Sequence, residues 1–162
     1  MHNEAQEKEI IIGTDSFEDK KLIDSNTKVE EYWYELGVVP NEVNSRGFRY
    51  TTFHLDLIHK WLIDVVYGKM VEYAYVPLHL TNFPDNSTLN LEKMCARITG
   101  FEVIDGKTWI RVVPIGPLAD LFITHNERLK IVSYMVGCVN EVDGINTVAE
   151  DAQMLYFFLT QK

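Results

Sequence analysis

The stretch that decides the fold is "MCARITGFEVIDGKTWIRVVPI", Met94–Ile115. Two runs rich in β-branched and aromatic residues flank Asp105 and Gly106. An Asp-Gly pair suits the positive backbone angles of a tight turn between two strands. The pattern therefore predicts an antiparallel β-hairpin, around which the other elements can be placed.

The strongest helical signal lies ahead of this hairpin, in "TFHLDLIHKWLIDVVYG" at residues 52–68. Its apolar residues recur at spacings of three and four, as on one face of a helix. They are Leu55, Ile58, Trp61, Leu62, Val65 and Val66. Thr51 or Thr52 can cap the start and Gly68 can end the helix. His54 and His59 are separated by about 140° around such a helix, so we expect solvent-facing or edge histidines rather than a shared metal site.

The remaining segments alternate between strand and helix signals. Strands are predicted in residues 29–39, 70–80, 130–144 and 152–162, and a short helix in residues 116–129. The last strand, "AQMLYFFLTQK", is almost wholly apolar, so we expect it to be buried on both faces or in an interface. This order predicts an α+β fold, with a compact, mostly antiparallel, barrel-like sheet and two helices.

The chain divides into two parts by composition. Residues 1–27 are polar and acidic apart from the short run "EIIIG" and show no sustained period. We expect an N-terminal arm that orders only against a partner. The packed domain is expected to span residues 28–162. With 162 residues, of which 46% are apolar, the chain is long enough for one domain with a real core.

Charge and cysteine content exclude several classes of function. A net charge of −9 with no cluster of Lys or Arg would repel a phosphate backbone, so no nucleic-acid partner is expected. No membrane span and no secretory signal are recognisable. Cys95 and Cys138 lie singly in apolar segments, which predicts buried thiols in a reducing compartment, with no disulfide and no metal. No cofactor is expected.

Two catalytic arrangements can be considered from the residues alone. The first uses Ser133 as a nucleophile, with His79 or His125 as the base and Asp151 or Asp85 orienting it. A serine inside an apolar strand is, however, more often a small packing residue. The second takes "HLT", residues 79–81, as half of a paired His-x-Thr phosphodiesterase site, which needs two such tripeptides. The chain has no second one, so this arrangement is excluded.

Four segments together resemble the prohead core proteases of large tailed bacteriophages, which share their fold with the herpesvirus assembly proteases. The family has a Val-Asn-x-x-Gly-x-x-Tyr turn before a helix, and "VNSRGFRY" precedes residue 52 here. Its Leu-Asn-His-Pro-Asp segment is similar to "LTNFPDNSTLNL", residues 80–91. The hairpin follows, and then the serine strand and the closing acidic strand correspond to "IVSYMVGCV" and "DAQMLYFFL". The resemblance covers about residues 31–160 in the family's order.

The resemblance implies a degenerate catalytic site. The family's histidine falls on Phe83, whose ring can neither accept nor return a proton. Its two adjacent serines fall on Val132 and Ser133. Tyr134 and Met135 replace the family's Arg and Gly, which removes the glycine expected near a backbone oxyanion site. Asp151 matches the family's acidic position.

Two hypotheses of function follow from this comparison. The first is a non-enzymatic phage virion or head-assembly protein that binds structural proteins such as the major capsid protein, as a homo-oligomer or bound to the virion. Its arm and last strand would be the contact elements. The alternative is an active serine maturation protease that cleaves scaffold and capsid precursors using Ser133, His79 and Asp151. Either protein would be found in the host cytoplasm during assembly, and the first also in the virion.

Overall fold

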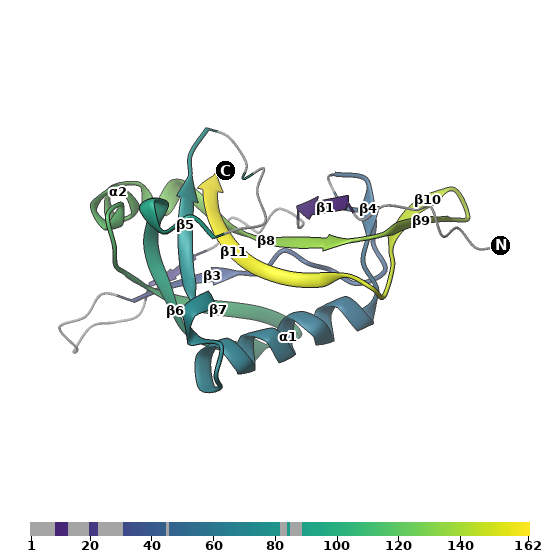
Figure 1. The fold of residues 1–162 in the computed structure, drawn as a ribbon, viewed down its shortest axis with the longest axis horizontal. Helices are drawn as coiled ribbons and strands as arrows, with labels where there is room; N and C mark the ends of the chain where they lie inside the picture. The colour runs from purple at the N-terminus through teal and green to yellow at the C-terminus, as the bar shows by residue number, and fades with distance from the viewer. Residues whose placement is uncertain (1–8, 13–19, 23–30, 45, 82–83, 85–88) are drawn as a thin grey trace.

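The computed structural model describes residues 9–12, 20–22, 31–44, 46–81, 84 and 89–162. Most strands belong to one mixed sheet of eight, which curls into a half-barrel (Figure 1). In spatial order these strands are β1 (Glu9–Ile12), β8 (Leu129–Gly137), β11 (Gln153–Gln161), β5 (Tyr75–His79), β6 (Met94–Ile104), β7 (Lys107–Pro114), β3 (Tyr32–Glu35) and β2 (Lys20–Leu22). All neighbours are antiparallel except β5 and β11, which run parallel.

A smaller sheet and two α-helices complete the fold. The smaller sheet contains β4 (Phe48–Arg49), β10 (Ile145–Val148) and β9 (Val139–Val142). The helices are α1 (Thr52–Tyr67) and α2 (Ala119–His125), and short 3-10 turns lie at Val71–Tyr73, Leu91–Lys93 and Asn126–Arg128. The predicted α+β class, with a barrel-like sheet and two helices, is confirmed. Among the described residues, no helix is long and apolar enough to cross a membrane.

The predicted hairpin is formed by β6 and β7. Ile104 pairs with Lys107, and the two residues between them, Asp105 and Gly106, have φ angles of 53° and 78°. The Asp-Gly sequence supplies these left-handed conformations at low cost. An irregularity between Ile98 and Gly100 shifts the register once, and such bulges increase the local bend of a sheet.

Helix α1 follows the predicted periodicity, but the prediction for His54 was wrong. The apolar face of the helix packs on the sheet, with Ile58 and Leu62 fully buried. His54 is fully buried too. Its Nδ1 accepts a hydrogen bond from the Thr51 backbone N–H at 3.1 Å, and its Nε2 donates to the Ala149 carbonyl at 2.9 Å. A polar ring is tolerated inside because both of its nitrogens are satisfied.

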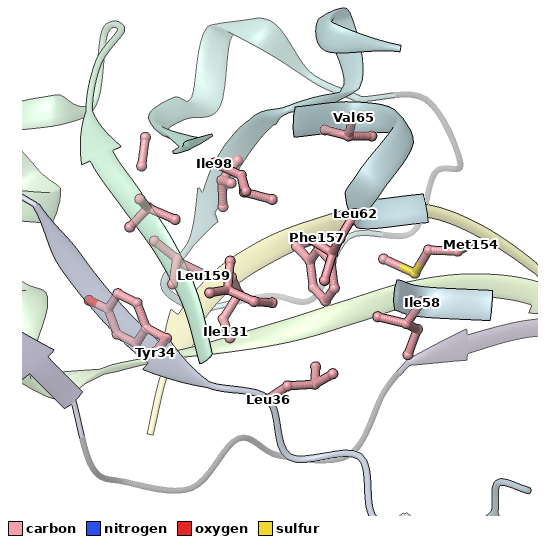
Figure 2. Close-up of a cluster of buried hydrophobic side chains, with 14 of the residues drawn as sticks. Tyr34, Leu36, Ile58, Leu62, Val65, Ile98, Ile131, Met154, Phe157 and Leu159 are labelled. Carbon is pink, nitrogen blue, oxygen red and sulfur yellow. The ribbon is translucent and has the colours of Figure 1, made fainter. Parts of the chain in front are cut away.

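The core consists of two clusters on opposite faces of β8 and β11. The main cluster lies between the sheet and α1, where side chains such as Leu62, Ile131 and Phe157 meet (Figure 2). The second cluster contains Val132, Tyr134, Tyr156 and Phe158. The Tyr134 and Tyr156 rings stack with centroids 4.8 Å apart. Both faces of these two strands are therefore buried, as predicted for the last strand.

Strand β11 lies inside the large sheet. It pairs with β8 along most of its length and with β5 at Leu159 and Thr160. That the last strand contacts a partner stays a prediction. Two stretches of the predicted N-terminal arm, β1 and β2, pair with β8 and β3. That the arm needs a partner to order stays a prediction.

Candidate functional site

Ser133 lies on the face of β8 that points into the main core. Its neighbours at alternate positions, Ile131 and Met135, belong to the main cluster, as does its cross-strand partner Phe157. Ser133 has no exposed surface, and its Oγ has no hydrogen-bond partner among the described residues. Within the described part of the chain, this hydroxyl therefore has no base in reach to take its proton.

His79 lies on the opposite face of the sheet. It ends β5, where its carbonyl accepts a hydrogen bond from the Thr160 hydroxyl at 2.7 Å. Its ring meets the ring of Phe158 edge-on, with centroids 5.8 Å apart. Phe158 belongs to the second cluster and pairs with Val132 in the β8–β11 register. His79 therefore shares a face with Val132, and the structure does not bring it to the Ser133 hydroxyl.

Asp151 has a structural contact at the far end of β8. Its Oδ1 accepts a hydrogen bond from the Cys138 backbone N–H at 2.9 Å. Cys138 is five residues beyond Ser133, which corresponds to about 17 Å along an extended strand. The Ala149 N–H also donates to the Cys138 carbonyl, at 2.9 Å. Asp151 thus fastens the turn before β11 to the end of β8, away from both Ser133 and His79.

The other candidate residues do not complete a site. Phe83 and Asp85 lie outside the described residues, so the predicted contact of Phe83 with Ser133 stays a prediction. Leu89, which follows these residues, packs on the second cluster. That cluster lies on the face of β8 opposite to Ser133. His125 ends α2 and lines a polar surface hollow of about 440 Å³. No described contact links it to Ser133.

The titratable groups with perturbed pKa values lie on different elements of the fold, and among them Cys95 contributes, after burial, to the pKa shift of Tyr34. Burial raises the pKa of Tyr34 and of Tyr50 above the ordinary value, and raises that of the Cys95 thiol to about 12. Burial lowers the pKa of His59, with an opposing contribution from Asp56. Active sites are expected to concentrate such shifts. Within the described part of the chain, no three His, Cys, Asp or Glu residues are grouped as a metal site would require.

Neither Cys95 nor Cys138 forms a disulfide, but the two differ in burial. Cys95 is buried, as predicted, and its Sγ lies 3.4 Å from the Val76 carbonyl oxygen. Cys138 is only half-buried, because it follows the last residue of β8 at the end of the sheet. The prediction of two buried thiols was therefore right for Cys95 and wrong for Cys138.

The arrangement of sheet and helices is that of a phage prohead protease. A solved structure with this arrangement is that of the bacteriophage T4 capsid assembly protease, gp21, which superposes with a TM-score of 0.74. The superposition covers 99% of each chain at 15% sequence identity. No family model and no curated protein matches the sequence. The likeness establishes a prohead-protease-like fold for this chain.

Proposed function

We propose that the protein is a non-enzymatic phage virion or head-assembly protein that uses a degenerate prohead-protease fold as a structural module. The observation that carries the proposal is the orientation of β8. Its serine, Ser133, faces the main core, and the β8 side chains on the face that His79 shares include Val132 and Tyr134. The strand therefore presents no serine hydroxyl to the histidine.

The packing around His79 supports the same proposal. Phe158, Tyr156 and Tyr134 fill the face that His79 shares, and all three are at most 2% exposed. A substrate carbonyl would need space beside the base and donors directed at its developing negative charge. Closely packed rings are suited to stability rather than to peptide binding.

An active protease would require a different register for β8. A slip of one residue exchanges the two faces of a strand, and would bring Ser133 to the side of His79. The same slip would move Ile131 and Met135 out of the main core. Losing buried aliphatic side chains of this size costs about 2–5 kcal/mol each. The proposal is accordingly a structural subunit that binds capsid proteins during assembly in the host cytoplasm and is retained in the virion.

A serine-reactive fluorophosphonate separates the two functions. The full-length protein is incubated with the probe beside an active serine protease as a positive control, and labelling is read by intact mass. We expect no labelled protein, because an unassisted serine hydroxyl is protonated and unreactive at neutral pH. Stoichiometric labelling at Ser133 that is abolished by His79→Ala would overturn the proposal. In purified particles, we expect the chain to be retained at full length.

A further inference from the structure

The outer face of α1 carries a row of exposed side chains at alternating spacings of three and four. They are Phe53, Asp56, Lys60, Ile63 and Tyr67. This is the spacing of the a and d positions along a helix that packs against another helix. The inner face of α1 already packs on the sheet, and the helix lies at the border of the molecule (Figure 1).

The row combines apolar ends with opposite charges in the middle. Phe53, Ile63 and Tyr67 remain 38%, 50% and 71% exposed. Isolated exposed apolar side chains are common and need no explanation. Here, however, they share one seam with Asp56 and Lys60, neither of which has an ion-pair partner within the part of the chain that the structure describes.

We propose that this seam binds a second copy of the chain, with the two α1 helices antiparallel about a two-fold axis. A two-fold axis between Asp56 and Lys60 places each Asp56 opposite the other copy's Lys60. It also places each Phe53 opposite the other copy's Ile63. An interface of this kind is self-complementary, as closed dimers require. A parallel pairing would instead place Asp56 against Asp56, and like charges in contact are unfavourable.

The size of the seam sets the expected strength of the dimer. Stable interfaces bury about 800 Å² on each partner, and one pair of four-turn helices offers less. The dimer should therefore be weak and depend on concentration. Such self-association suits a protein that becomes concentrated in an assembling shell. The inference uses only exposed residues of α1, so it stands whether or not the protein is catalytic.

Charge reversal tests the arrangement, using sedimentation velocity on the full chain over a range of concentrations. Asp56→Lys places Lys against Lys, and Lys60→Asp places Asp against Asp, so each variant alone should dimerise about tenfold or more weakly than wild type. A mixture of the two variants should dimerise again. At positions 56 and 60 one variant then has two lysines and the other two aspartates, so every facing pair is of opposite charge. Glu102→Lys, an exposed charge on β6, is the control and should leave dimerisation unchanged.

Loss of the dimer can be told apart from loss of the fold. The substituted side chains are exposed, so each variant should stay folded, and circular dichroism verifies this. Ile63→Glu provides a second route, since it buries a charge in the same seam and should also give monomers. A monomeric wild-type protein at every concentration would overturn the proposal. Single variants that dimerise like wild type, or a mixture that stays monomeric, would overturn it too.

Discussion

Ser133 faces Phe157 across the β8–β11 ladder, on the side of the sheet that α1 covers. The Phe157 ring in turn packs against Trp61 of that helix, with centroids 5.4 Å apart. The serine hydroxyl is thus enclosed by apolar groups. Burying a hydroxyl without a hydrogen bond costs free energy, so this side chain weakens the fold at the place where the protease resemblance locates the nucleophile.

Removing the Ser133 hydroxyl should therefore not destabilise the protein. For Ser133→Ala we expect a free energy of unfolding that is unchanged or higher by up to about 1 kcal/mol, measured by urea denaturation. Thr160 is the matched control, because its buried hydroxyl does donate a hydrogen bond, to the His79 carbonyl. Thr160→Val should lose about 1–2 kcal/mol. Equal losses in both variants would show that Ser133 has a partner.

The ring of His54 should be important for stability. It joins the start of α1 to the turn before β11 through the Ala149 carbonyl. His54→Ala removes two hydrogen bonds and a fully buried ring, so we expect a loss of about 2–4 kcal/mol, again from urea denaturation. His125→Ala, at a half-buried position near the surface, should change stability by less than about 0.5 kcal/mol. A small loss for His54→Ala would contradict the structural role assigned to this ring.

The sequence predicted the elements whose signals are local. The Asp105-Gly106 turn and the three-and-four spacing in α1 identify a hairpin and a helix without knowledge of the rest of the chain. The order of the strand and helix signals then supplied the fold class, and the family motifs supplied the resemblance to the prohead proteases. The N-terminal strands β1 and β2 were missed because they are only four and three residues long, and their pairing depends on two sheet edges formed by distant segments.

The candidate site could not be predicted because β8 is apolar on both faces. In "KIVSYMVG" neither the odd-numbered nor the even-numbered residues form a polar set. The alternation of side chains along a strand therefore cannot tell which of the two sets faces the core. Ser133 and His79 were grouped by residue type, whereas the sheet separates them by face. The burial of His54 did have a local signal. The spacing Thr51-x-x-His54 is that of a helix cap in which the third residue reaches back, usually as Glu or Gln.

Acid should destabilise the protein partly through His59. Its Nε2 lies 2.7 Å from the Thr108 hydroxyl, and its ring stacks on Phe101. Burial lowers the pKa of His59, and the nearby Asp56 carboxylate, on the same helix, partly raises it again. Because burial lowers the pKa of His59, the unfolded chain binds the proton more tightly. This contribution is therefore complete above about pH 6.5, the ordinary histidine value, and declines as the pH falls below it.

The measurement is the free energy of unfolding as a function of pH, for wild type and for His59→Gln. Glutamine cannot titrate, so the variant should show a shallower decline in the mildly acidic range just below the ordinary histidine pKa. Carboxylates titrate at lower pH and should affect both proteins equally. An identical decline in the two proteins would show that His59 is not responsible.

Two glycines in different strands of the large sheet, Gly137 in β8 and Gly100 in β6, should respond differently to an added methyl group. At Gly137, the end of β8, a Cβ would lie 2.7 Å from the Ala152 Cα, which is backbone in the turn held by Asp151. At Gly100 it would lie 2.7 Å from Nη2 of Arg111, the end of a long side chain. Backbone moves less readily than a side-chain end, so Gly137→Ala should cost about 2–3 kcal/mol and Gly100→Ala about 1 kcal/mol.

Thermal and urea unfolding of both variants test this difference. The Arg111 guanidinium donates to the Thr99 carbonyl at 2.7 Å and to its hydroxyl at 3.0 Å. Moving it aside loses part of these bonds, which is why the cost for Gly100→Ala is not zero. A larger loss for Gly100→Ala than for Gly137→Ala would mean that the junction of β8 with the turn at Ala152 yields more easily than the Arg111 side chain. That result would show that the close approach to Ala152 is not the reason for a glycine at position 137, the end of β8.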